Sequence, residues 1–288
     1  MLALAKLLAR IPLPVLQMIG ALLGWLVWVA SPSFRRKLRG NLRQSGLAQN
    51  DSDYTRLLYS SIAEHGRGGL EVLAHWMRPP ATLLARTTRS GWEHVEAALA
   101  SGRPLIFLSP HLGAIELTGV CIGSWLPRKL APLYRPPKQA WLEPLMLYSR
   151  SRGGSTPAPA DARGVRVLLK TLKSGGMAYL LPDQVPGSGE GIWAPFFGKP
   201  AYTMTLWARL AESSNAILLP CYTIRTKPGH YHFHVQPFSG EANGDPLHDA
   251  SLLNRNLEDL IRQAPAQYLW SYNRYKRPSG APRPEEQA

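Results

Sequence analysis

The chain has 288 residues, with 33 lysines and arginines against 19 aspartates and glutamates, which gives a formal net charge of +14. Such a surface favours polyanions: nucleic acid, anionic lipid headgroups or an acidic carrier protein. Nucleic acid is the least supported partner, because no zinc-finger spacing, RNA-binding aromatic motif or basic heptad accompanies the charge. Two cysteines, Cys121 and Cys221, lie a hundred residues apart in apolar runs, so we expect buried thiols and no disulfide framework.

Residues 11–30 form an uncharged, apolar stretch long enough to cross a hydrocarbon core of roughly 30 Å as a helix. It is longer than a usual signal-peptide core, and no persuasive cleavage site follows it. Two prolines and two tryptophans leave open a helix that lies in the membrane interface. The segment after it is more basic than the one before it, so we expect the rest of the chain on the cytoplasmic side.

Helical spacing of apolar residues continues from Arg39 to about Met77. Residues 104–109 (PLIFL and a serine) read as a buried strand, residues 110–112 as a turn, and residues 113–124 as a helix.

Strands and helices then alternate. We expect a strand over KLAPLYRP, ending at Arg135, a helix from about Lys138 to Arg150, an amphipathic helix over 161–174 with a basic outer face, and a strand over MAYLLPD. The glycine-rich segment 186–200 lacks the ending of a phosphate-binding loop and reads as a mobile edge of a pocket.

The remaining expected elements are a helix over 202–213, a hairpin over 216–238 and a last helix over 250–263. His230, His232 and His234 alternate on one strand face, but no acidic or cysteine ligand is nearby, so we expect no metal and no bound cofactor.

This order predicts an α/β fold: a mixed, largely parallel sheet flanked by helices, with an N-terminal membrane-associated helix. We divide the chain into a membrane-anchoring helix (1–33), an α/β domain (34–277) and a disordered tail (278–288).

The most informative chemistry is His111, at the end of the expected strand, followed five positions later by Glu116. Residues five apart on a helix do not face each other, so His111 should precede the helix while Glu116 rises from its first turn. Glu116 could accept the proton of one ring nitrogen and leave the other to take a proton from a substrate hydroxyl. A buried polar pair without chemistry is the alternative.

Several motifs in order resemble the bacterial lipid A late acyltransferases of the lauroyl and myristoyl type, within the lysophospholipid-acyltransferase-like superfamily. The resemblance rests on RGNL (39–42), SPHLGAIE (109–116), YRPP (134–137), SRSRG around Arg150, PDQ (182–184), PFFG (195–198) and QYLWSYNRYKRP (267–278).

The resemblance implies that His111 and Glu116 are a catalytic dyad and that Arg150 and Asp183 match two further positions needed for activity. It also implies an acyl carrier protein thioester as donor and a lipid A precursor hydroxyl as acceptor, at the cytoplasmic face of the inner membrane. Arg150 or Arg135 could stabilise an oxyanion or hold a phosphate, and either could instead be a structural ion-pair partner. Asp183 could anchor one of these arginines or contact substrate.

Three alternatives stay open. An acyl-CoA-dependent phosphatidylinositol mannoside acyltransferase shares this dyad, whereas glycerol-phosphate acylation is doubtful because the E-G-T-R type motif is missing. A non-catalytic lipid-binding protein would be expected to lose a dyad member, and both are present. A serine hydrolase is weaker, since the chain has no G-x-S-x-G elbow.

Overall fold

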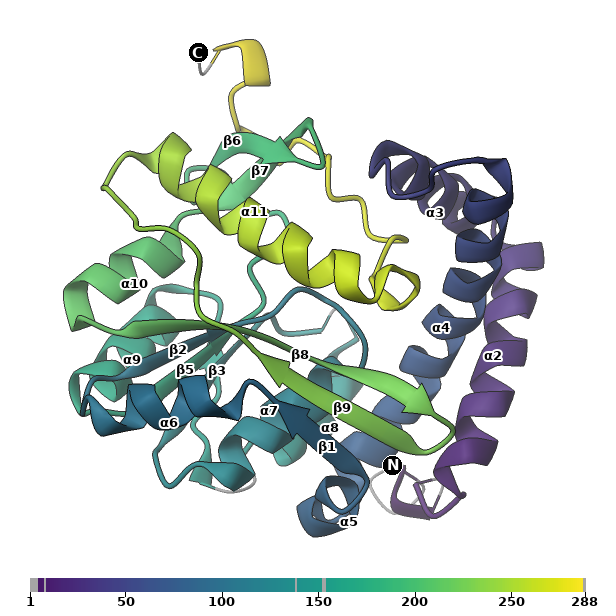
Figure 1. The fold of residues 1–288 in the computed structure, drawn as a ribbon, viewed down its shortest axis with the longest axis horizontal. Coiled ribbons are helices and arrows are strands. Elements are labelled where there is room, and N and C mark those ends of the chain that lie inside the picture. Colours follow the sequence, from purple (N-terminus) through teal and green to yellow (C-terminus); the bar gives the residue numbers. More distant parts are fainter. Residues whose placement is uncertain (1–4, 8, 138, 152–153, 287–288) are drawn as a thin grey trace.

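A seven-stranded, largely parallel sheet forms the centre of the computed structural model, which describes residues 5–7, 9–137, 139–151 and 154–286 (Figure 1). Its strand order is β1-β9-β8-β2-β5-β3-β4, and only the β8–β9 pair is antiparallel. The strands are β1 (Thr87–Ser90), β9 (His230–Val235), β8 (Ile217–Lys227), β2 (Leu105–Leu108), β5 (Met177–Leu180), β3 (Leu130–Tyr134) and β4 (Ala158–Pro159). The predicted fold class is confirmed.

Helices cover both faces of this sheet. The helices are α5 (Pro80–Leu84), α6 (Trp92–Ala100), α7 (Ile115–Trp125), α8 (Glu143–Arg150), α9 (Ala162–Lys173), α10 (Leu206–Ser214) and α11 (Pro246–Gln263). Along β2, Leu105 and Phe107 pack with α6 and α7, while Ile106 and Leu108 pack with α9, α10 and α11. A strand covered on both faces reads as a continuous apolar run, which is why LIFL was recognisable in the sequence.

Three helices precede the sheet: α2 (Leu13–Ala30), α3 (Pro32–Gln44) and α4 (Asp51–Met77). The expected single helical stretch from Arg39 to Met77 is therefore wrong between 45 and 50. Gly46 has a positive φ of 64° there, and the Asn50 side chain caps α4 by accepting from the backbone N–H of Asp53. Among the described residues, α2 is the one helix long and apolar enough to cross a membrane.

The glycine-rich segment contains a second, two-stranded sheet that the sequence reading missed. β6 (Gly191–Phe196) pairs antiparallel with β7 (Lys199–Met204), so the expected helix from Tyr202 begins only at Leu206. The turn between the strands puts Phe197 and Gly198 at positive φ. The segment after Pro278, expected to be disordered, contacts this hairpin: Ala281 is buried, and the indole N–H of Trp193 donates to the carbonyl of Pro282 at 2.9 Å.

Candidate active site

His111 lies just beyond the carboxyl end of β2, outside the helix as predicted, and α7 starts four residues later at Ile115. Its backbone carbonyl accepts from the N–H of Leu269 at 3.0 Å, and the next residue, Leu112, forms a bridge with Tyr268. Gly113 has a positive φ of 66°, and a side chain there would overlap the carbonyl oxygen of Thr223. The histidine is thus held by the C-terminal segment on one side and by β8 on the other.

The partner of the His111 ring is Asp183, which follows the carboxyl end of the neighbouring strand β5. Asp183 Oδ1 lies 2.6 Å from Nδ1 of His111, and Asp183 Oδ2 accepts from the backbone N–H of His111 at 2.8 Å. An ionised carboxylate can only accept, so Nδ1 carries the proton and Nε2 keeps its lone pair. The side-chain amide of Gln184 lies 3.0 Å from Nε2 and donates to it.

The predicted ring contact between His111 and Glu116 is therefore wrong, because Asp183 is the carboxylate at the ring. Asp183 does not anchor Arg150, which pairs with Glu116 instead. Parallel neighbours end at the same sheet edge, so the residues after β2 and β5 meet there, although they are far apart in sequence.

Asp183 is 2% exposed and remains ionised. Burial alone would raise its pKa, but the charge of the His111 ring when it is protonated, the two hydrogen bonds from His111 and the charge of Arg274 outweigh burial and lower the pKa. Arg274 is itself buried and bonds to the carbonyl of Tyr202 at 2.7 Å. The sequence reading did not single out Arg274; its place in the NRYKRP motif was the available signal.

Glu116 lies in the first turn of α7, as predicted, and its side chain pairs with Arg150 at the end of α8. Arg150 Nη2 donates to Oε1 at 2.6 Å and Nε donates to Oε2 at 3.3 Å. Burial would raise the pKa of Glu116, yet the charge and hydrogen bonds of Arg150 lower it, while the pKa of Arg150 is raised by the glutamate against the effect of its burial. Both groups are therefore charged at neutral pH.

A largely apolar pocket opens beside this ion pair. Its lining includes Ile115, Glu116, Gly119, Val120, Gly123, Leu130, Pro132, Leu133, Arg150, Tyr179 and Leu181. Two glycines one helical turn apart leave the α7 wall open, since they place no side chain there. The pocket is narrow, with a cavity volume of about 50 Å³, and its otherwise apolar wall contains one charged pair.

The remaining sequence candidates are Arg135 and the histidines of β9. Arg135 is exposed just after the carboxyl end of β3. His232 and His234 of β9 both contact the hydroxyl of Ser90 at 2.8 Å. Within the described part of the chain, no group of three or more histidines, cysteines or acidic residues could hold a metal ion.

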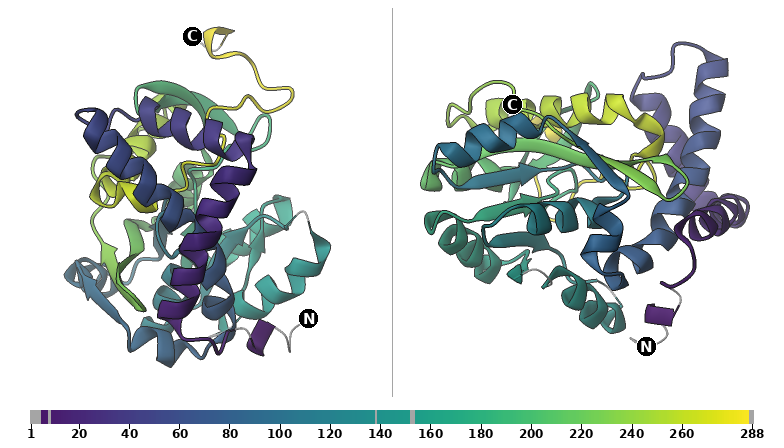
Figure 2. Two further views of the ribbon diagram at one scale, coloured as in Figure 1. Left: turned by 90° about the vertical axis from the view of Figure 1, so that its right-hand side faces the viewer. Right: turned by 60° about the horizontal axis from the view of Figure 1, so that its bottom comes forward.

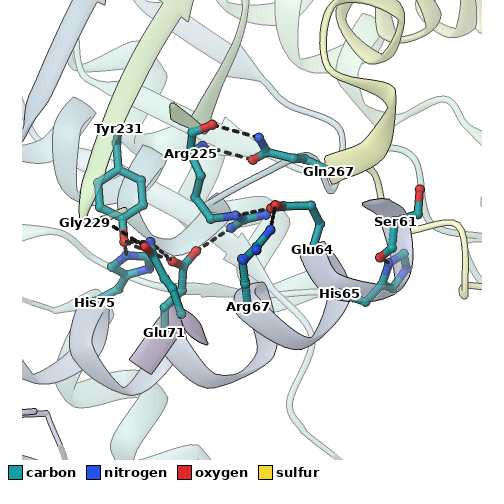
Figure 3. A network of polar contacts seen from close by, with 11 residues as sticks. Ser61, Glu64, His65, Arg67, Glu71, His75, Arg225, Gly229, Tyr231 and Gln267 are labelled. Atoms are coloured by element: carbon teal, nitrogen blue, oxygen red, sulfur yellow. Dashed lines mark hydrogen bonds and ion pairs between the residues drawn. The ribbon is translucent and has the colours of Figure 1, made fainter. Parts of the chain in front are cut away.

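A buried polar network joins α4 to β8 and to Gln267 (Figure 3). Arg225 of β8 forms ion pairs with Glu64 and Glu71 of α4, and both the backbone N–H and carbonyl of Arg225 bond to the side chain of Gln267 at 2.9 Å. The carbonyl of Gln267 accepts from the N–H of Gly113 at 3.0 Å. The network thus joins α4, β8 and the loop that carries the histidine.

Comparison with known proteins identifies the family to which this chain belongs. The family model of the bacterial lipid A biosynthesis acyltransferases matches residues 1–277. The chain is 26% identical to the lipid A biosynthesis lauroyltransferase of Escherichia coli over 281 residues, covering 96% of this chain and 90% of that protein. It is 25% identical to the palmitoleoyltransferase of the same organism over 280 residues, covering 94% and 88%.

A lipid A biosynthesis acyltransferase of Haemophilus influenzae is 28% identical over 196 residues, or 67% of this chain and 60% of that protein. The family match spans every residue of the site described above, from His111 to Arg274. The chain accordingly belongs to the bacterial lipid A biosynthesis acyltransferase family and is an acyltransferase.

Proposed function

We propose that this enzyme transfers a fatty acyl chain from an acyl carrier protein thioester to a hydroxyl of a lipid A precursor, with His111 as general base. The observation that carries the mechanism is the contact of Asp183 with Nδ1, which keeps the proton there and leaves Nε2 able to accept one. Gln184 marks the direction from which a substrate hydroxyl would approach, because its amide already occupies that lone pair. The hydroxyl would take the place of this amide.

In the proposed step, Nε2 takes the proton of the acceptor hydroxyl while the oxygen attacks the thioester carbonyl carbon. The tetrahedral oxyanion then collapses, the carbon–sulfur bond breaks, and the imidazolium returns the proton to the departing thiolate. No acyl-enzyme is required. In support, burial raises the pKa of the Cys121 and Cys221 thiols, so neither is an activated nucleophile.

Arg150 is the proposed electrostatic group, and Glu116 is the residue that holds it. Two donors of the guanidinium engage the Glu116 carboxylate, which fixes the plane of the fork beside the pocket. A cation fixed in this way stabilises an oxyanion or a phosphate without reorganising. The apolar pocket, about 50 Å³ in this structure, would have to widen to take the acyl chain. The basic surface would favour both an acidic carrier protein and anionic lipid.

The test is acyl transfer to a lipid A precursor from labelled thioesters, with acyl carrier protein and coenzyme A donors compared. We expect transfer from the carrier protein, and a loss of about 10²–10⁴-fold in His111→Ala. His94→Ala removes a half-exposed histidine outside the site and should behave as wild type. Equal or better rates with coenzyme A would overturn the donor assignment, and a wild-type rate in His111→Ala would overturn the base.

A further inference from the structure

The outward face of α2 is entirely apolar. Leu22 is 66% exposed, Met18 59% and Val29 70%. The exposed positions of α2 are Pro14, Val15, Met18, Ile19, Leu22, Leu23, Trp25, Leu26, Val27, Val29 and Ala30. Apolar patches of this extent on a folded chain mark a binding surface.

The opposite face of α2 is built into the domain. Gly20 and Gly24 lie against Gly66 of α4 so closely that a side chain on Gly66 would overlap the carbonyl oxygen of Gly20. Gln17, 4% exposed, donates to Glu71 Oε2 at 2.9 Å and accepts from the N–H of Gly229 at 2.8 Å. These contacts fix the rotation of α2 about its axis, so its apolar face always points away from the domain. Figure 2 shows α2 lying along the domain beside α4, without projecting from it.

Charged groups lie level with the middle of α2. The Cβ position of Gly20 is 2.9 Å from the Cα of Arg67, and Arg67 forms an ion pair with Glu64. Both residues line a groove shared with Met18, Leu22 and Trp25 of α2 and with Lys227 at the end of β8. If α2 crossed the bilayer, this ion pair would lie near the hydrocarbon midplane, where charged side chains are strongly disfavoured.

We propose that α2 is an in-plane anchor: it lies parallel to the membrane surface, with its apolar face among the acyl chains of one leaflet. The occupant of this face is a leaflet that contains anionic phospholipid. Lys227 and Arg67 flank the apolar face, and α3 turns Arg36, Arg39 and Arg43 outward just beyond its end. This combination of a broad apolar face and flanking cations is that of interfacial helices.

The test places single cysteines at the two ends of α2, Arg10→Cys and Arg36→Cys, both at exposed positions. The native cysteines are buried and provide a low background. A membrane-impermeant maleimide is applied to spheroplasts and to inverted inner-membrane vesicles. We expect both cysteines to be labelled from the same side. Labelling from opposite sides means that α2 spans the membrane and overturns the proposal.

Binding is measured by flotation with vesicles of phosphatidylethanolamine and phosphatidylglycerol. Leu22→Glu combined with Leu26→Glu should lower the bound fraction at least tenfold, whereas Leu247→Glu, at an exposed leucine of α11, should leave it unchanged. Lys227→Gln should weaken binding to these vesicles and leave binding to phosphatidylcholine vesicles unaltered. Thermal unfolding confirms that each variant is folded. Unchanged flotation of the folded double variant would refute the anchor, and neither readout depends on the acyl-transfer chemistry.

Discussion

Replacing Asp183 by asparagine tests whether Asp183 or Glu116 is the carboxylate that orients His111. Both oxygens of the Asp183 carboxylate contact His111, one at 2.6 Å from Nδ1 and the other at 2.8 Å from the backbone N–H. An asparagine has one oxygen, and the backbone N–H can only donate, so the amide NH₂ turns toward Nδ1. It donates to Nδ1, the ring proton moves to Nε2, and the base is lost.

The expected loss is that of general-base catalysis, about 10²–10⁴-fold in kcat, or about 2.7–5.5 kcal/mol in the activation barrier. KM should change little, because Asp183 touches the histidine and is not proposed to touch substrate. The loss in stability is smaller: one hydrogen bond to a charged group contributes about 1.5–3 kcal/mol. The larger change in free energy is therefore expected in the activation barrier.

The assay is the initial rate of labelled acyl transfer to a lipid A precursor for wild type, Asp183→Asn and Glu116→Gln, with urea unfolding of the same preparations. Asp183→Glu is the conservative control, since a carboxylate at this position can restore part of the rate. A kcat for Asp183→Asn within threefold of wild type would refute the assignment of Asp183 as the residue that orients His111.

Three further outcomes are expected. Glu116→Gln leaves Arg150 buried with an uncompensated charge, so urea unfolding should show a loss of about 3–5 kcal/mol in the free energy of unfolding. Adding Arg150→Met should recover much of this loss. A loss below about 1 kcal/mol would contradict a buried ion pair. The fold lowers the pKa of both Asp183 and Glu116, so the stability that these carboxylates contribute is present above their unfolded pKa of about 4. This contribution is lost as pH falls through the folded pKa. Urea midpoints measured from pH 7 to 3 should therefore fall less steeply in the Glu116→Gln/Arg150→Met variant than in wild type. Gly119→Ala adds a methyl group 3.6 Å from the Tyr179 ring, so mass spectra of the products should shift toward shorter chains, whereas Gly40→Ala, whose new methyl meets nothing within 4 Å, should leave them unchanged.

The elements of the site were readable from local sequence because each depends on neighbouring residues. An apolar run followed by Pro110 and His111 indicates a buried strand and its end, and a glutamate in the next turn suits the start of a helix. The structure has β2, the loop and α7 in these places. The amphipathic helix α9 and the β8–β9 hairpin follow from periodicity in the same way.

The pairing within the site was not readable from local sequence. His111 and Asp183 meet because β2 and β5 are parallel neighbours in the sheet, and strand order depends on packing between distant segments. Glu116 instead faces α8, where Arg150 meets it. Spacing along the chain indicated a carboxylate partner for the histidine, but only the sheet determined which carboxylate it was.

The same division holds for the apolar helix α2. Local sequence predicted an apolar helix over residues 11–30, and α2 covers Leu13–Ala30, because apolarity and helix propensity are sums over neighbouring residues. The face of α2 that is buried was decided by distant contacts, those of Gln17 with Glu71 and of Gly20 with Gly66. Sequence determined which groups are available, and tertiary packing decided which of them meet, because contact between distant segments depends on how the whole chain fills space.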